Sequence, residues 1–440
     1  MTRKLFVVIF CFLLVVNILS VNGIKNNRKI NNFESRTIDS GWLEVRNGVK
    51  ILHISGSNYD MGFQHGSLLA EEVKQDVRAF LNYSTVSFDY LLDIWDVMKD
   101  YVPNAYIEEM QGLADGAGIS FNELAAANMV VIVSDMGCFG ISAWGDATID
   151  GKLYHARSFD QPFNIKDPVT GIFAHENSVL IIRDPDDGFA SMNPSVAGTM
   201  HGGGGINEHG IAIGQQVCWS DDYTLEGTPG QFRVQQVLDH ASTDLEAIDI
   251  LTTNRDLGWN FIVSDSKIPA GYAVETSANY TYTGTYDNPT EGMNPFWNIK
   301  DIVRRTNFFI DPVLASTQRA QYNPSGLLSF IKLVLRTDVF FAVWRSYKVC
   351  SEGIEKNYGS MSLNSTMTML RNCYSGKTDF LLRLIVILAE GTSFNRAWNM
   401  WVADPDNGDM VVCFASKDKI SFCNPVHYFN FYELLNSTPP

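Results

Sequence analysis

The chain has 440 residues, a formal net charge of −16 and 45% hydrophobic residues. A chain of this length can bury one large core or two medium ones, and its hydrophobic content is that of an ordinary globular protein. The acidic balance argues against a nucleic-acid partner, because nucleic-acid phosphates require a basic protein face.

Residues 1–23 have the composition of a secretory signal peptide. Arg3 and Lys4 precede an apolar run at 5–19, and small residues lead up to Gly23. The apolar run is shorter than the roughly 20 residues that a membrane-spanning helix needs. We expect cleavage near Gly23, secretion or delivery to a lysosome-like compartment, and no stable membrane insertion after the signal is removed.

Export would make Asn-x-Ser/Thr sequons candidate glycosylation sites. The sequence contains four of them, at Asn82, Asn279, Asn364 and Asn436. A chain rich in asparagine carries several sequons by chance, so they indicate surface location more than a role.

The pattern between the signal and residue 137 is mostly helical. A Gly-rich turn opens the segment 56–69 and leads into a helix that continues to about Leu81. Apolar spacing predicts further helices at 88–101 and 104–117. Ser120 with Glu123 forms a capping box, which predicts the start of another helix.

The stretch 137–160 predicts a β-hairpin. Residues 139–144 are apolar, and residues 152–156 resume the extended pattern. Asp150-Gly151 between them is the strongest two-residue hairpin signal.

This hairpin predicts a reactive cysteine. Cys138 lies at the start of the first strand, and Arg157 and Asp160 lie just past the end of the second, so the hairpin brings all three together. A thiolate is the reactive form of cysteine, and a fixed positive charge nearby lowers the thiol pKa. The alternative is a buried structural cysteine beside an ordinary Arg–Asp pair.

The cysteine count limits disulfide bonding. Cys11 leaves with the signal, and six cysteines remain. If Cys138 stays a free thiol, at most two disulfides can form. Neighbours in the sequence suggest the pairs Cys350–Cys373 and Cys413–Cys423. Three bridges among all six would exclude a cysteine nucleophile.

Short strands dominate after the hairpin, interrupted by helices expected at 229–240 and 244–254. His201 opens a His-Gly-Gly-Gly run of the kind seen in lipase oxyanion loops, but the chain contains no Gly-x-Ser-x-Gly, so we reject a lipase. From Gly326 to Glu390 the apolar content rises. This region predicts either a helix pair covering a sheet or an apolar channel for an acyl chain.

The Gly-Cys strand pair with its Arg157-x-x-Asp160 resembles the nucleophile hairpin of N-terminal-nucleophile (Ntn) hydrolases. The resemblance is strongest to the acyl-coenzyme A:6-aminopenicillanic-acid acyltransferase family, and the run 157–163 also resembles acid ceramidases. It covers most of 45–320 and again about 390–430. It implies an α+β fold, the Ntn-hydrolase four-layer αββα sandwich of two antiparallel sheets, preceded by a helical pro-segment.

The resemblance further implies self-cleavage between Gly137 and Cys138, after which the freed α-amine of Cys138 serves as general base. The expected organisation is a signal peptide at 1–23, a mostly helical segment at 24–137 and an Ntn-hydrolase domain at 138–440. The segment 24–137 is a candidate small subunit and partner of the rest of the chain.

The same resemblance implies roles for further residues. Arg157 and Asp160 would fix the amine and tune the thiolate. Asn207 and Asn307 would donate hydrogen bonds to the tetrahedral oxyanion, and Arg319 is a candidate substrate or active-site arginine. Asn207 could instead be an asparagine that tolerates a left-handed turn between strands. Phe308 stands where the family has a histidine, which removes any role of that histidine.

The sequence therefore predicts an exported cysteine-nucleophile amidohydrolase or acyltransferase that works on a linear amide through an acyl-enzyme thioester. The substrate would be a small-molecule or lipid amide. We expect no cofactor and no metal, since the eight histidines lack zinc-ligand spacing. Two alternatives remain: an acid-ceramidase-like hydrolase of N-acyl lipids, and a catalytically silent secreted glycoprotein that uses the fold for binding.

Overall fold

The computed structural model describes residues 36–134, 137–200, 202–318, 325–335, 340–388 and 395–439. The expected signal peptide, Cys11, His201 and Arg319 lie outside the described residues. The chain from Ser35 to Pro440 forms one compact unit.

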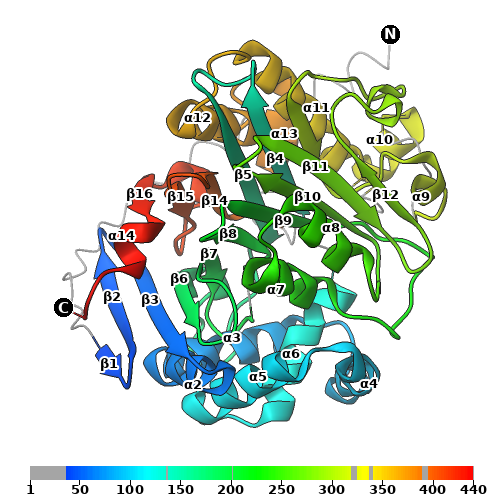
Figure 1. Cartoon of the computed structure of the whole chain (residues 1–440). Helices are drawn as coiled ribbons and strands as arrows, with labels where there is room; N and C mark the ends of the chain where they lie inside the picture. Colours follow the sequence, from blue (N-terminus) through cyan, green and yellow to red (C-terminus); the bar gives the residue numbers. More distant parts are fainter. Residues whose placement is uncertain are drawn as a thin grey trace, which may run out of the picture. The chain divides into compact units, whose positions relative to one another are not determined.

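Two β-sheets occupy the centre of this unit (Figure 1). The first has ten strands in the order β1-β2-β3-β6-β7-β8-β9-β10-β11-β12, and the second has six in the order β13-β4-β5-β14-β15-β16. Their bounds are β1 (Arg36–Ile38), β2 (Gly41–Arg46), β3 (Val49–Gly56), β4 (Gly137–Gly145), β5 (Gly151–Pro162), β6 (Ser178–Pro185), β7 (Ser191–Val196), β8 (Gly204–Asn207), β9 (Ile211–Val217), β10 (Trp259–Asp265), β11 (Ala270–Thr276), β12 (Thr281–Gly284), β13 (Ile302–Arg305), β14 (Asn395–Asp404), β15 (Asp409–Phe414) and β16 (His427–Asn430).

Neighbouring strands in both sheets run antiparallel, as expected, with the exception of β3 and β6, which pair in parallel. A parallel pair requires a long crossover connection. Here the chain between β3 and β6 supplies it, since it contains five α-helices and the hairpin β4–β5.

The helices predicted in the N-terminal part are present, and Ser120 and Glu123 form the predicted capping box of α6. The α-helices are α2 (Asn58–Leu68), α3 (Ala70–Tyr83), α4 (Phe88–Met98), α5 (Asn104–Ala117), α6 (Phe121–Val133), α7 (Gly230–His240), α8 (Asp244–Thr252), α9 (Pro312–Ser316), α10 (Leu327–Val334), α11 (Phe340–Lys356), α12 (Leu363–Tyr374), α13 (Phe380–Leu388) and α14 (Phe431–Leu435). Short 3-10 helices are η1 (Lys99–Tyr101), η2 (Ala174–Asn177), η3 (Pro289–Gly292) and η4 (Ser421–Cys423).

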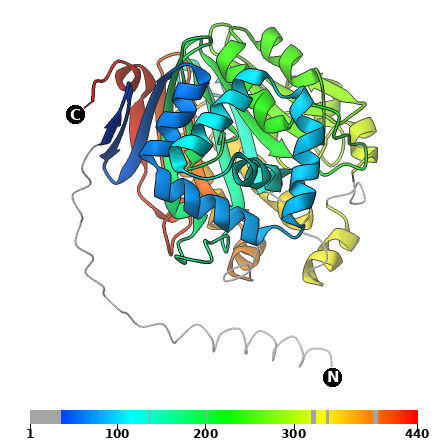
Figure 2. The same ribbon diagram turned by 90° about the horizontal axis from the view of Figure 1, so that it is seen from below.

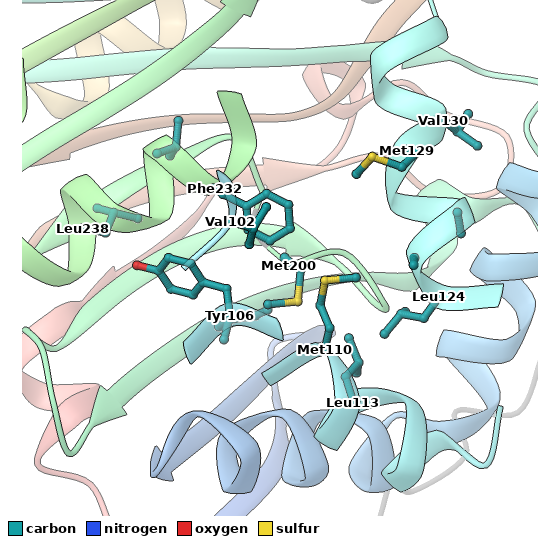
Figure 3. Packing of buried hydrophobic residues seen from close by; sticks show 14 of the residues in the cluster. Val102, Tyr106, Met110, Leu113, Leu124, Met129, Val130, Met200, Phe232 and Leu238 are labelled. Carbon is teal, nitrogen blue, oxygen red and sulfur yellow. The ribbon is translucent and has the colours of Figure 1, made fainter. Parts of the chain in front are cut away.

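The sheets and helices form four layers, which confirms the αββα sandwich. Helices α2–α8 pack on the outer face of the first sheet, where Phe232 and Met110 meet strand residues such as Val179 (Figures 2 and 3). The inner faces of the two sheets meet through residues such as Met192 and Trp401. Helices α11 and α12 cover the outer face of the second sheet.

The N-terminal segment is integrated into this sandwich. Its strands β1–β3 extend the first sheet through the β3–β6 pair, and its helices share one apolar cluster with α7, β9 and β10. Figure 3 shows Tyr106 and Met110 from this segment beside Phe232 of α7, in the same apolar cluster as Leu124 and Leu238. The expected boundary at residues 137 and 138 therefore falls inside one packed unit.

The predicted disulfides are not formed, although the Cys350 and Cys373 thiols lie within hydrogen-bond reach of each other. The six cysteines among the described residues, Cys138, Cys218, Cys350, Cys373, Cys413 and Cys423, all have free thiols. Cys413 is buried in the apolar layer beneath α12, whereas Cys423 is exposed.

Over the described ranges, no individual helix has the length and apolar character needed to cross a membrane. Helices α5 and α6 meet that requirement only as a pair, and they are bent by 119° relative to each other.

Candidate active site

The β4–β5 hairpin is confirmed and brings the predicted residues together. Gly137 pairs with Asp160, and Cys138 pairs with Phe159. Two details differ from the prediction. The connection is longer than two residues, running from Gly145 to Gly151, and β5 continues to Pro162, so Asp160 lies inside the strand rather than beyond it.

Each polar atom of Cys138 is held by a different buried residue. Its backbone N–H donates to Asn307 Oδ1 at 2.7 Å. Its carbonyl oxygen accepts from Thr306 Oγ1 at 2.8 Å. Its Sγ lies 3.5 Å from Arg157 Nη2, within hydrogen-bond distance for sulfur. The residue is therefore fixed at its nitrogen, its carbonyl and its thiol.

Arg157 is fully buried and anchored by main-chain carbonyls. Its Nε and Nη2 donate to the Gln215 carbonyl at 3.2 and 3.0 Å, and its Nη1 donates to the Gly202 carbonyl at 3.1 Å. Glycine is required beside it, because a Cβ at Gly203 would lie 2.7 Å from Arg157 Nη2, and Gly203 has φ +75°. The main chain thus aims one guanidinium nitrogen at Cys138.

The pKa of the Cys138 thiol is raised to about 11. Burial is the largest cause, because an apolar surrounding disfavours the thiolate. The charge of Arg157 acts in the opposite direction but does not compensate. Before any cleavage the thiol is therefore protonated at neutral pH, contrary to the expectation of an activated thiolate beside Arg157.

Asp160 lies on the α12 side of the second sheet. Its Oδ2 accepts from the Tyr374 hydroxyl at 3.0 Å, and its Oδ1 accepts from the Ser158 hydroxyl. Burial raises the pKa of this carboxyl to about 6, against the hydrogen bonds from Ser158 and Tyr374 that lower it. The backbone N–H of Asp160 reaches the Cys138 thiol and favours its charged form.

Two neighbours fix Asn307. The side-chain amide of Asn260 donates to the carbonyls of Thr306 and Phe308, both at 2.8 Å. Arg305, two residues before Asn307, donates to Glu275 Oε1 at 2.7 Å. The Asn307 side chain itself bridges two strands, because its Nδ2 donates to the Val217 carbonyl at 2.9 Å.

The structure places Asn307 beside Cys138, but its amide nitrogen donates to the Val217 carbonyl, so its oxyanion role stays a prediction. The atom that faces Cys138 is the amide oxygen, which accepts from the backbone nitrogen. This geometry suits holding an amine better than donating to an oxyanion.

The prediction that Asn207 is an oxyanion donor is wrong. Its Nδ2 donates to the carbonyls of Leu238 and Ala241 at 3.0 and 2.9 Å, and its Oδ1 accepts from the backbone N–H groups of His209 and Ile211. Both amide hydrogens are used to join the turn after β8 to the end of α7. Asn207 is a structural residue, in line with the alternative interpretation of its sequence.

A small cavity of about 40 Å³ lies beside the β4–β5 hairpin. Its lining includes the apolar side chains of Phe80, Val131 and Phe159 and the amide side chains of Gln161, Gln215 and Gln231. Phe159 is the cross-strand partner of Cys138, whereas Phe80 and Val131 belong to α3 and α6. The N-terminal segment therefore forms one wall of this cavity.

Sequence reasoning missed Thr306 and Tyr374. Thr306 adjoins Asn307, and the Thr-Asn pair could have identified it. Tyr374 is separated from Asp160 by 214 positions, and nothing in the sequence points to the contact. The four predicted glycosylation sites, Asn82, Asn279, Asn364 and Asn436, are all exposed.

The residues that the structure describes include no group of three or more His, Cys, Asp or Glu side chains arranged to hold a metal ion. The site is built from one thiol, one guanidinium, one carboxyl and amide groups. This set is suited to nucleophilic acyl transfer.

One known protein family matches part of this chain. The family model described as acyl-coenzyme A:6-aminopenicillanic acid acyl-transferase matches residues 148–325. The resemblance to this acyltransferase family is confirmed. The match spans Arg157, Asp160 and Asn307 and begins downstream of Cys138.

Curated relatives are similar over part of their length. A protein of Archaeoglobus fulgidus described as "Uncharacterized protein" is 28% identical over 275 residues, which make up 54% of this chain and 45% of that protein. Protein dcd1A of Dictyostelium discoideum is 26% identical over 275 residues, with 56% of this chain and 62% of that protein covered. The chain thus spans about half the length of the curated relatives that it matches.

Among solved structures, the Caenorhabditis elegans N-acylethanolamine-hydrolyzing acid amidase ortholog is 13% identical with a TM-score of 0.39, covering 61% of this chain and 93% of that one. Penicillin V acylase from Agrobacterium tumefaciens is 14% identical with a TM-score of 0.35, covering 68% of this chain and 87% of that one. The layered sandwich agrees with the fold that the resemblance implies, and the acyltransferase-family match covers residues 148–325 of it.

Proposed function

We propose that this chain is the precursor of a cysteine-nucleophile amide hydrolase or acyltransferase that cleaves itself between Gly137 and Cys138. The main support is the way that Asn307, Thr306 and Arg157 hold the nitrogen, carbonyl and sulfur of Cys138 separately. Any buried residue needs partners for its backbone N–H and carbonyl, but a structural cysteine in an apolar core needs no guanidinium at its sulfur.

In the self-cleavage, the Cys138 sulfur attacks the carbonyl carbon of Gly137. The bond between that carbon and the Cys138 nitrogen breaks, and the nitrogen takes up a proton in exchange for the thiol proton. Water then hydrolyses the resulting thioester, which leaves a carboxylate on Gly137 and a free α-amine on Cys138. Asn307 Oδ1 already accepts from this nitrogen, so it would hold the new amine in place.

In turnover, the α-amine takes the thiol proton as the sulfur attacks a substrate amide. The amine leaving group departs with a proton, and the acyl group stays on sulfur as a thioester until water or an acceptor amine removes it. Release of Gly137 also exposes the thiol to water. This relieves the burial that holds the thiol pKa at about 11, while the attraction of Arg157 remains.

The chemistry of the cavity lining suits a linear amide with an apolar acyl part, and the cavity would have to widen well beyond its about 40 Å³ after cleavage to admit one. Apolar side chains would contact the acyl group, and the side chains of Gln161, Gln215 and Gln231 would meet its polar end. Because Phe80 and Val131 line the same cavity, the N-terminal segment would stay bound after cleavage as part of the substrate site. Ceramide-like N-acyl lipids are the second candidate substrate class, favoured by the apolar helices after residue 326.

Secretion or a lysosome-like location, with glycans on the four exposed sequons, remains part of this proposal. It is supported by the sequence of residues 1–23 and by the exposure of all four asparagines.

The test compares the wild-type chain with Cys138→Ala, with Cys423→Ala at an exposed free cysteine as the matched control. We expect two fragments in the wild type and in Cys423→Ala, with one fragment starting at Cys138 by intact-mass spectrometry and N-terminal sequencing. Cys138→Ala should remain one chain, fold normally by circular dichroism and lose at least about 10⁴-fold in amide turnover.

A wild-type chain that stays intact and hydrolyses neither N-acyl amino acids nor ceramides would overturn the proposal. That result would favour the silent glycoprotein instead. Hydrolysis of ceramide alone would select the lipid substrate class.

A further inference from the structure

The helices after residue 326 expose an apolar patch. On α10 and the residue after it, Leu327, Val334 and Leu335 are 73%, 65% and 66% exposed, and the start of α13, which also contacts α11, exposes 82% of Phe380. Exposed single apolar residues are normal, but five of them on one short helix and the residue after it indicate an interaction surface. We call the set Leu327, Leu328, Ile331, Val334, Leu335 and Phe380 the apolar patch.

The patch sits on packed helices. Phe330, at the edge of the exposed side of α10, contacts Phe341 of α11 with ring centroids 5.2 Å apart, and Ser329 on the far side is buried. Helix α11 also packs against α13. In Figure 2 the yellow and orange helices of this region stand out at the lower edge of the ribbon. The exposed side of α10 therefore results from how the helix packs.

The charge around the patch differs from the rest of the chain. Residues 325–388 contain eight Lys or Arg and four Asp or Glu, although the whole chain has a net charge of −16. Lys377 and Arg383 are exposed on the two sides of Phe380 in the sequence. Basic side chains beside exposed leucine and phenylalanine are typical of helices that lie in an anionic membrane interface.

We propose that α10 and α13 dock this protein onto a lipid bilayer with anionic headgroups. The apolar patch inserts among the acyl chains, while the basic side chains meet the headgroups. A symmetric dimer through this face would place two such basic surfaces against each other, so like-charge repulsion disfavours a second copy here.

The patch connects to the candidate active site through α11. Phe340 at the start of α11 lies 5.9 Å, centroid to centroid, from Phe308, the neighbour of Asn307. Helix α12, which follows α11, carries Tyr374 to Asp160. Docking would therefore bring a bilayer to the helices that support the site. This part rests on the proposed function and selects N-acyl lipids as its substrates.

The segment is also separate from the family resemblance. The acyltransferase-family match ends at residue 325, just before α10 begins. Membrane docking would thus be a property of this chain's own helices rather than of the matched region.

The test is flotation of the full-length expressed protein with two kinds of vesicle, phosphatidylcholine alone and phosphatidylcholine mixed with phosphatidylglycerol. We expect binding to the mixed vesicles and much weaker binding to the neutral ones. Leu327→Asp and Val334→Asp should each reduce the partition coefficient about tenfold or more, because each removes one inserted apolar side chain. The double variant Lys377→Glu/Arg383→Glu should remove the preference for phosphatidylglycerol.

Leu245→Asp is the matched control, because Leu245 is 72% exposed on α8, on another layer of the sandwich. It should bind like the wild type. The proposal is overturned if the wild type ignores both vesicles, if Leu245→Asp is weakened as much as Leu327→Asp, or if size-exclusion chromatography shows a dimer that Val334→Asp dissociates. This binding assay needs no turnover, so its outcome is independent of whether Cys138 is catalytic.

Discussion

At the residue scale, the competition between burial and charge at Cys138 decides the state of the thiol. Arg157 lies 3.5 Å from the sulfur, yet the pKa of the thiol is raised to about 11 because both groups are buried. A guanidinium beside a cysteine therefore does not by itself create a thiolate. In this structure the Cys138 thiol stays protonated at neutral pH.

The effect of Tyr374 on the pKa of Asp160 can be tested directly. It donates to Asp160 Oδ2, and this hydrogen bond lowers the pKa of a carboxyl that burial has raised to about 6. Tyr374→Phe should move that pKa further up. If the proposed enzyme requires ionised Asp160, activity rises as pH increases through the Asp160 pKa. The acidic limb of the kcat/KM profile should then shift to higher pH, while activity well above this range stays near that of the wild type.

A merely structural role of Tyr374 would lower activity equally at every pH. Tyr90→Phe, on the exposed face of α4, is the control and should leave the profile unchanged. An unshifted acidic limb in Tyr374→Phe would show that Asp160 does not control the reaction.

At the element scale, helices α2 and α5 cross with their backbones in direct contact. A Cβ added at Gly62 would lie 1.9 Å from the Glu109 carbonyl oxygen, and one at Gly112 would lie 2.0 Å from the Tyr59 carbonyl oxygen. Gly66 and Gly116, one turn further along their helices, face the partner backbone in the same way. The turn expected to open the segment 56–69 is therefore short, and Gly62 and Gly66 lie in helix α2, where they allow close packing against α5.

Gly62→Ala should destabilise the fold by about 3 kcal/mol or more, because backbone atoms on the facing helix cannot yield to the new methyl group. The expected result is a lower melting temperature and less folded protein. Gln111→Ala changes an exposed position of the facing helix α5 and should melt within a degree or two of the wild type, roughly as surface substitutions do. A wild-type melting temperature for Gly62→Ala would mean that the two helices are free to move apart.

At the scale of the whole molecule, a buried ion network joins the N-terminal segment to the rest. Arg183 of β6 is paired with Glu109 of α5, and its Nη2 donates to Glu109 Oε2 at 3.0 Å. Asp239 of α7 lies 3.7 Å from the same Nη2 and accepts from the Tyr106 hydroxyl at 3.1 Å. The network spans the proposed cleavage point, so it would hold the two fragments together.

Glu109→Gln should destabilise the protein by about 3 kcal/mol, because it leaves a buried guanidinium with one distant carboxylate. Thermal unfolding measures this directly. If the chain is processed, size-exclusion chromatography in urea should show the fragments separating at a lower urea concentration than in the wild type.

Glu108→Gln, at the exposed neighbouring position, should leave both measurements unchanged. Equal unfolding of the two variants would indicate that apolar packing alone joins the segments.

The sequence by itself determined the parts of this protein that depend on local pattern. The hairpin around Cys138, the α6 capping box and the succession of N-terminal helices follow from apolar spacing and capping residues, which act over a few positions. The resemblance to the acyltransferase family added the sandwich and placed Asn307 beside Cys138.

The tertiary structure decided whatever depends on distant partners. The amide hydrogens of Asn207 are bonded to carbonyls at the end of α7. The Tyr374 hydroxyl donates to Asp160, 214 positions away in the sequence. The described cysteines have free thiols. The protonated state of Cys138 belongs to the same group, because burial is produced by all the layers together and outweighs the one charge that the sequence places nearby. Local pattern fixes which groups a strand presents, whereas desolvation and hydrogen-bond partners are set only when remote segments pack around them.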